Sequence, residues 1–358
     1  MATTYGKNLK LKIYGGSHDE YVGMVLSGFP AGIKIDIERL LGFMKRRAPG
    51  QNAYSTKRRE PDIPVFLSGV SDNVTTGEDI EAIIYNVNHR SGDYSSLYDI
   101  PRPSHADYVA RVKYGEEVDL RGGGHFSGRL TAPMCIAGGI CIQLLEQKGI
   151  HVAAHIHSVA GIKDEGFDSV NVCFDDFSKL SARDFPTIDK DAGIAMQNEI
   201  ENARLDCDSV GGVIECAAIG LPVGLGEHIF DGVEGRISGI MFGIPAVKGI
   251  EFGLGFGSCS LRGSQNNDSF CTDGKTIRTL TNNCGGILGG MTDGMPLIFR
   301  VAFKPTPSIA KKQQSVSLSR MENVELTIGG RHDPCVVPRA VPVVEAACAI
   351  ALCDMLSD

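Results

Sequence analysis

The pattern of hydrophobic and polar positions predicts short strands that alternate irregularly with helices. Five segments have the apolar, β-rich character of strands: residues 9–14, 22–27, 151–159, 210–219 and 295–303. The first two flank a turn at Gly15 and Gly16, where glycine accommodates backbone angles that other residues avoid. Residues 76–87 fit a helix or a strand, and the pattern does not decide between them.

Six other segments have helical periodicity: residues 36–46, 106–114, 129–148, 191–205, 227–242 and 340–356. Asp36 is expected to cap the first helix, and Ser104 or Asp107 the second. Gly149 is expected to end the third. The last segment is apolar on almost every face, so we expect a buried helix, too short to span a bilayer. Because strands and helices do not alternate regularly, the predicted fold class is α+β, and no linker divides residues 1–358.

The composition is that of a globular protein, with 42% hydrophobic and 22% charged residues. A formal net charge of −8 argues against a nonspecific nucleic-acid binder, whereas basic patches at residues 45–47 and 57–59 suit a small anion or a solvated loop. Eleven cysteines form no C-x-x-C pair and lie mostly among small apolar residues. With no signal peptide visible, these features favour a cytoplasmic protein without a membrane role.

Residues 121–132, RGGGHFSGRLTA, are the most informative stretch. Three consecutive glycines allow positive φ angles and close approach of a ligand to the backbone. The helix that follows would present N–H groups at its positive dipole end, and Arg129 adds a cation at its first turn. The stretch therefore predicts a phosphate-binding loop, although a tight turn without a ligand satisfies the same pattern.

Other clusters place reactive side chains in glycine- or proline-rich loops: residues 14–18 with His18, 101–108 with His105, 330–334 with Arg331 and Asp333, and 283–290 followed by 304–308. The two histidines could act as acids or bases near neutral pH. Arg331 and Asp333 would face the same side of an extended chain. The glycines at 283–290 permit close approach of a planar cofactor or a phosphate. Each cluster also has an ordinary explanation as a loop, a helix cap or a surface ion pair.

Neither a metal site nor a dinucleotide-binding fold is expected. His151, His155 and His157 are close in sequence, and the last two share a strand face, but no carboxylate or cysteine has ligand-like spacing to them. Residues 253–257, GLGFG, lack the G-x-G-x-x-G pattern after a strand.

Taken together and in this order, the clusters resemble the chorismate synthase family. The matching stretches run from one end of the chain to the other: YGGSH (14–18), RRAPGQ (46–51), SGVSDNVTTGE (68–78), PRPSHADY (101–108), RGGGHFSGRLTA (121–132), DSVGG (208–212), PAVKGIEFGLGF (245–256), LRGSQNND (261–268), NNCGGILGGMTDG (283–294), KPTPSI (304–309) and GRHDPCVVPRAVPVVEA (330–346). The match is weakest at about residues 150–190.

The resemblance implies a lyase of the shikimate pathway that gives chorismate from 5-enolpyruvylshikimate 3-phosphate by anti-1,4-elimination of phosphate. It also implies dependence on reduced FMN, which lends electron density to the substrate without net redox change. The implied fold is a single domain in which antiparallel sheets sandwich a buried helical layer, assembled as a homotetramer. Without a dinucleotide fingerprint or long insertions, we expect an external flavin reductase rather than flavin reduction by this chain with NADP.

Matching the family's motifs residue by residue implies roles for individual side chains. His18 would protonate the leaving phosphate, His105 would protonate the reduced flavin, and Asp333 would work with the flavin N5 to remove the C6 proton. The implied substrate-binding positions are Ser17, Arg47, Arg129 and Arg331. The implied flavin-contacting positions are His125, Phe126, Ser127, Ala246, Gly289, Lys304, Pro305, Thr306, Pro307, Ser308 and Arg331.

The chain departs from the family pattern at five positions, each of which removes a fixed charge. Gly16 and Leu130 stand where the family usually has glutamate, and Ala48, Ala53 and His125 where it has arginine. We still expect an active enzyme, because the clamping arginines and both key histidines are present. The alternatives are a divergent flavin-dependent phosphate lyase and a non-catalytic relative that binds flavin or anions.

Overall fold

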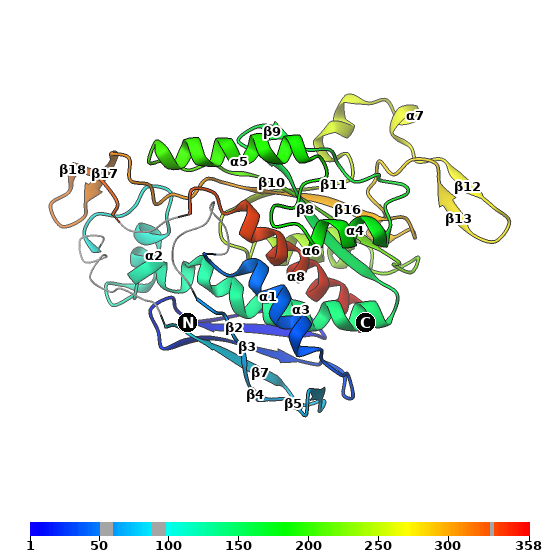
Figure 1. Ribbon diagram of the computed structural model, residues 1–358, viewed down its shortest axis with the longest axis horizontal. Coiled ribbons are helices and arrows are strands. Elements are labelled where there is room, and N and C mark those ends of the chain that lie inside the picture. Colours follow the sequence, from blue (N-terminus) through cyan, green and yellow to red (C-terminus); the bar gives the residue numbers. More distant parts are fainter. Residues whose placement is uncertain (51–59, 88–97, 330–332) are drawn as a thin grey trace.

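Two antiparallel sheets enclose a layer of helices in the computed structural model, which describes residues 1–50, 60–87, 98–329 and 333–358 (Figure 1). The first sheet has the strand order β1-β2-β3-β7-β4: β1 Ala2–Tyr5, β2 Lys10–Gly15, β3 Tyr21–Ser27, β7 Ile80–Tyr85 and β4 Val65–Ser68. The second has the order β11-β16-β10-β8-β9: β11 Val247–Phe252, β16 Leu297–Phe303, β10 Gly212–Ile219, β8 His151–Val159 and β9 Ile162–Lys163. The expected α+β sandwich is confirmed.

The layer between the sheets consists of α1 (Ile37–Arg47), α3 (Thr131–Gln147) and α8 (Val337–Met355). α3 packs against β3 and β7 of the first sheet, and α8 packs against β8 and β10 of the second. Every residue of α8 except Arg339 is buried, as its apolar sequence predicts. Residues 128–147 form a helix long and apolar enough to cross a membrane, but 83% of its most apolar stretch is buried inside the protein. One hydrophobic cluster joins both sheets through this layer.

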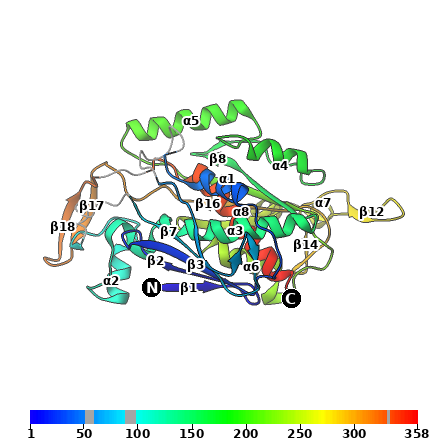
Figure 2. The same ribbon diagram turned by 60° about the horizontal axis from the view of Figure 1, so that its bottom comes forward.

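Smaller elements surround the sandwich. α4 (Phe174–Ser181) and α5 (Lys190–Leu205) cover the outer face of the second sheet near β8 (Figure 2). The remaining helices are α2 Asp107–Tyr114, α6 Val233–Met241 and α7 Gly263–Asn266, and the 3₁₀ turns are η2 Arg121–Phe126, η3 Gly128–Leu130, η4 Ile229–Asp231 and η5 Gly255–Ser260. Two-stranded pairs are β5 Val70–Ser71 with β6 Val74–Thr75, β12 Phe270–Thr272 with β13 Ile277–Thr279, β14 Ile287–Leu288 with β15 Met291–Thr292, and β17 Gln313–Ser317 with β18 Glu322–Leu326.

Most predicted elements are confirmed, and the ambiguous segment 76–87 contains strand β7. Asp36 caps α1 by accepting a hydrogen bond from the backbone N–H of Arg39 at 3.0 Å. The prediction for residues 227–242 is wrong in its first third, because Ile229 has a φ of +60° and a helix forms only after Gly232. The predicted cap of α2 is also wrong: Ala106 occupies that position without a side-chain bond.

A buried ion-pair group lies on the outer face of the second sheet, where the fold brings to His155 two carboxylates that no ligand-like spacing in the sequence indicates. Glu215 of β10 lies opposite His155 of β8 in strand register. His155 contacts Asp164 through Nδ1 at 3.2 Å and Glu215 through Nε2 at 3.0 Å. Ligand atoms of His155, His157 and Glu215 lie within 4.8 Å of one another. Because both ring nitrogens of His155 already contact carboxylates, an ion-pair network accounts for the group.

This network predicts a pH-dependent stability. Burial works to lower the pKa of His155, but Asp164 and Glu215 outweigh it and raise that pKa above its ordinary value near 6.5. A raised folded-state pKa gives stability that is fully present below the unfolded pKa and is lost as pH rises through the folded one. The wild type should therefore be more stable than a His155→Gln variant. The difference between their free energies of unfolding, measured in urea titrations, should be larger at pH 6 than at pH 9.

A matched control is His228→Gln, since His228 pairs with Glu227 on the surface and both side chains are more than half exposed. That variant should track the wild type at both pH values. If the difference in free energy of unfolding between the wild type and His155→Gln were equal at pH 6 and pH 9, the ionised network would be contradicted.

Candidate active site

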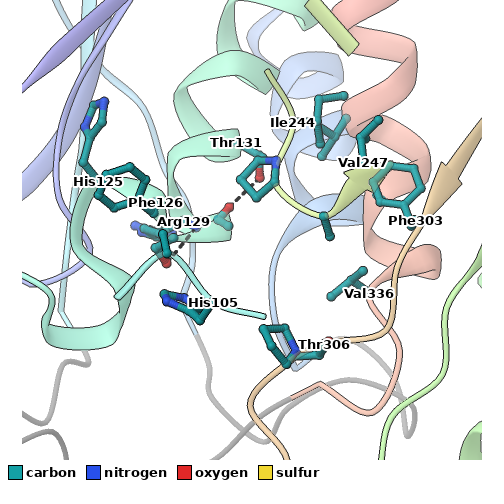
Figure 3. A pocket seen from close by; sticks show the side chains of 18 of the residues that line it. His105, His125, Phe126, Arg129, Thr131, Ile244, Val247, Phe303, Thr306 and Val336 are labelled. Carbon is teal, nitrogen blue, oxygen red and sulfur yellow. Dashed lines mark hydrogen bonds between the residues drawn. The ribbon is translucent and has the colours of Figure 1, made fainter. Parts of the chain in front are cut away.

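A cavity of about 930 Å³ opens at one end of the helical layer, a volume typical of ligand sites. Figure 3 shows its two facing walls, with His105, Phe126 and Arg129 on one and Ile244, Val247, Phe303 and Val336 on the other. Among the described residues, six basic side chains line it (Arg47, Arg102, Arg129, Lys248, Lys304 and Arg339), against two carboxylates (Glu60 and Asp333). In a chain with a net charge of −8, this excess of cations marks a site for an anionic ligand.

The glycine loop forms one wall because its backbone takes angles that side chains disfavour. Gly122, Gly123 and Gly124 have φ angles of +59°, +91° and +53°. A Cβ on Gly124 would lie 2.0 Å from the carbonyl oxygen of Asp119. α3 does not follow the glycines directly; η3 intervenes, and the Ser127 hydroxyl accepts from the N–H of Arg129 at 3.2 Å.

The β2–β3 turn docks against this loop and brings two predicted site residues to it. The backbone N–H of Ser17 donates to the carbonyl of Gly124 at 3.1 Å, and its hydroxyl donates to the carbonyl of Arg121 at 2.9 Å. The Ser17 hydroxyl also contacts His18 Nδ1 at 3.2 Å. His18 lies against Gly122 rather than on the cavity wall, since a Cβ on that glycine would meet its ring at 2.3 Å.

Arg47 and Arg129, the two described clamp candidates, share one buried carboxylate. Asp62 accepts from Arg47 Nη1 at 2.7 Å and also from Arg129 Nη1. Burial works to raise the pKa of Asp62, but the two guanidinium groups outweigh it and hold that pKa below its ordinary value. Burial also lowers the pKa of Arg129, which pairs in addition with Glu60 at 2.8 Å. The carboxylates therefore hold two like charges side by side at the cavity.

The two guanidinium groups are further fixed by polar groups of the surrounding elements. Arg47 Nε donates to the Thr131 hydroxyl at 3.1 Å, and Arg129 Nε donates to the Asn86 side-chain oxygen at 2.8 Å. The Nη2 of Arg47 donates to the carbonyl of Gly128 at 2.9 Å. Both arginines are therefore held in place before any ligand arrives, which favours tight binding of an anion.

An acid and a lysine also line the cavity. Asp333 pairs with Arg339 of α8. Burial lowers the pKa of Arg339, although the Asp333 carboxylate works to raise it. Lys304 lies just beyond β16 and donates to the carbonyl of Ser104 at 3.0 Å. Burial and the neighbouring cation of Lys248 lower the pKa of Lys304, as expected where positive charge gathers without an anion.

The cavity brings together most of the residues that the sequence singled out: Arg47, His105, His125, Phe126, Ser127, Arg129, Ala246, Lys304, Thr306, Pro307, Ser308 and Asp333 line it. Four others do not line it: Ser17 and His18 lie behind the glycine loop, Pro305 is exposed, and Gly289 lies in the turn between β14 and β15. Arg331 lies outside the described residues.

The sequence alone did not single out Glu60, Asp62, Asn86 or Arg339. Asp62 has one signal that only the structure reveals, a φ of +50° that is uncommon outside glycine. Its partners come from α1 and η3, far apart along the chain, so no spacing rule connects them.

Comparison with known proteins gives a consistent result across the whole chain. The family model described as "Chorismate synthase" matches residues 9–357. Chorismate synthases from Korarchaeum cryptofilum and Thermococcus kodakarensis are both 46% identical, each over 98% of this chain and 96% of the relative. One from Dehalococcoides mccartyi strain BAV1 is 45% identical over 99% of this chain and 96% of the relative.

The fold agrees as well. A crystal structure of chorismate synthase superimposes with a TM-score of 0.77 at 28% identity, covering 98% of this chain and 92% of that one. With this fold, this end-to-end similarity and a cation-lined cavity at the glycine loop, the chain belongs to the chorismate synthase family.

Proposed function

We propose that the cavity binds 5-enolpyruvylshikimate 3-phosphate together with reduced FMN and that the chain eliminates phosphate to give chorismate. The observation that carries this is the cavity's cationic lining, which converges beside the His105 imidazole and the Asp333 carboxylate. Prepositioned Arg47 and Arg129 suit a phosphate and carboxylates, for which guanidinium gives bidentate hydrogen bonds.

The residues present fit reduced FMN, which would supply electron density to the substrate as the phosphate leaves. The Thr306 hydroxyl is buried in the cavity wall without a hydrogen-bond partner among the described residues. Lys304 and Lys248 could bind the flavin phosphate through their ammonium groups, and Phe126 offers an apolar surface to a planar ring. Asp333, Arg339 and His105 would then hold or move protons in a site that the walls shield from water.

The wider setting is part of the same proposal. We infer a single domain over residues 1–358, since one hydrophobic cluster joins both sheets, and a homotetramer by analogy with the family. An external reductase would supply the reduced flavin. A reducing cytoplasmic location suits the cysteines, all of which are free thiols.

The deciding experiment is anaerobic incubation of the protein with 5-enolpyruvylshikimate 3-phosphate and chemically reduced FMN. Chorismate, detected by its absorbance, should appear in step with inorganic phosphate, and oxidised FMN should support neither. Binding of flavin and substrate without any product would favour a non-catalytic relative. Turnover of a different phosphorylated substrate alone would favour a divergent lyase.

A further inference from the structure

His105 projects from the loop before α2 onto the cavity wall. A Cβ built on Gly123 of the glycine loop would lie 3.4 Å from His105 Nε2. Nε2 therefore lies against the glycine loop, on the cavity wall that His105 and this loop share, while Nδ1 faces Asp107. The His105 side chain is 15% exposed, so solvent does not determine its orientation.

The side chain behind His105 is Asp107, the first residue of α2. Its Oδ1 lies 2.6 Å from His105 Nδ1. The same carboxylate accepts from the backbone N–H of Arg102 at 3.0 Å and from Arg102 Nε and Nη2 at 2.7 Å each. Burial works to raise the pKa of Asp107, but Arg102 and His105 outweigh it and hold it far below its ordinary value. Asp107 is thus a fixed carboxylate, 2% exposed, that reaches the cavity through two lining side chains, His105 and Arg102.

The geometry selects one tautomer of His105. Two groups lie close to His105 Nδ1: Arg102 Nη2 at 3.1 Å, which also donates to Asp107 Oδ1, and Asp107 Oδ1 itself at the shorter distance of 2.6 Å. A carboxylate at 2.6 Å can only accept, so Nδ1 carries a hydrogen and donates it to Asp107. In the neutral ring Nε2 then presents its lone pair to the cavity, and in the cation it presents a proton.

We infer that Asp107, held by Arg102, is a positioning residue that fixes His105 as the Nδ1–H tautomer with Nε2 as the atom that exchanges protons with the bound ligand. Arg102 Nη1 also donates to the Ser308 hydroxyl at 3.2 Å, so the group joins the His105 loop to the wall beyond β16. The expected effect on turnover rests on the proposed function, whereas the tautomer of His105 does not depend on it.

The tautomer can be measured without any activity. Long-range ¹H–¹⁵N correlation on the flavin-free, ¹⁵N-histidine-labelled protein, with His105 assigned by a His105→Gln variant, should show Nδ1 protonated and Nε2 bare at high pH. In an Asp107→Asn variant the signal should shift toward the other tautomer. A wild-type ring protonated at Nε2 would overturn the inference, whether or not the protein makes chorismate.

Kinetics test the consequence. Asp107→Asn should lower kcat by roughly 10²-fold while KM for the substrate changes less than about three-fold. In a His105→Ala background the same substitution should cost far less, because its effect through His105 is removed and only its support of Arg102 remains. Equal losses in both backgrounds would assign Asp107 a merely structural role and reject the inference.

The chain offers a matched control in Asp119, which binds the backbone N–H, Nε and Nη2 of Arg121 in the same manner. That pair is partly exposed, and the described contacts of His105 Nδ1 are with Asp107 and Arg102 instead. Asp119→Asn should leave the His105 tautomer unchanged, and a tautomer shift like that of Asp107→Asn would show a general effect of breaking such a pair.

Discussion

A Gly122→Ala variant is expected to fold like the wild type and to lose roughly 10²-fold in turnover. The added Cβ would lie 2.3 Å from His18 Cε1, 2.6 Å from its Nδ1 and 2.8 Å from the Ser17 hydroxyl. Ser17 is 1% exposed and bonded to Gly124 and Arg121, so it has no space to retreat. His18 must therefore rotate away from the loop, which displaces the predicted proton donor.

The backbone adds a smaller contribution, because alanine at a φ of +59° costs about 1 kcal/mol. That strain is local to a surface of the cavity and does not involve the core layer. The loss should consequently appear in kcat, measured anaerobically with reduced FMN, while thermal melting by circular dichroism shifts only slightly.

Gly128→Ala is the matched control in the same loop. A Cβ there meets nothing within 4 Å, and Gly128 is not among the residues with positive φ. Its carbonyl, which accepts from Arg47 and Thr131, is retained by alanine. Turnover of Gly128→Ala should stay near the wild-type value. A Gly122→Ala enzyme as active as Gly128→Ala would reject the placement of His18 against the glycine loop.

The fold was largely predictable because its elements carry strong local signals. α8 is apolar on almost every face, which predicts a helix that is buried on all sides, as in the middle layer of this sandwich. Asp36 caps α1 through the short-range hydrogen bond that its position predicts. The prediction of a helix over residues 227–242 was wrong at its start, because the helical periodicity extends across Ile229 and Gly232, whose backbone angles interrupt the helix.

The site was predictable only where its residues lie in recognisable motifs. The glycine loop was identified, but its carboxylate partners were not, because Asp62 reaches Arg47 and Arg129 through tertiary contacts that no spacing encodes. For the same reason the sequence did not indicate that Glu215 contacts His155. The two residues are 60 positions apart in sequence but lie opposite each other in the sheet.

The structure also shows that two of the departures from the family pattern lie next to each other. His125 Nδ1 contacts the carbonyl of Gly15 at 2.9 Å, so His125 is adjacent to the turn that contains Gly16. The family resemblance implies an arginine in place of His125 and a glutamate in place of Gly16, so the two departures remove opposite charges from neighbouring positions.

The largest expected effect on stability comes from Gly138→Ala, which should lower the free energy of unfolding by about 3 kcal/mol. Gly138 lies where α3 crosses α8, and its added Cβ would fall 2.2 Å from Ala346 Cβ and 2.3 Å from Ala346 Cα. Because the obstacle includes backbone, no rotamer change relieves it. The two helices must separate, which loosens the packing of α8 on β8 and β10 throughout the buried layer.

The same substitution at Gly42 should have the opposite sign. Gly42 lies inside α1, is exposed, and a Cβ there meets nothing within 4 Å. Alanine is a better helix former than glycine by about 1 kcal/mol, so Gly42→Ala should raise the free energy of unfolding by up to that amount. Urea titrations of both variants decide the matter: helix propensity alone predicts that both stabilise, whereas the close crossing of α3 and α8 requires that only Gly42→Ala does.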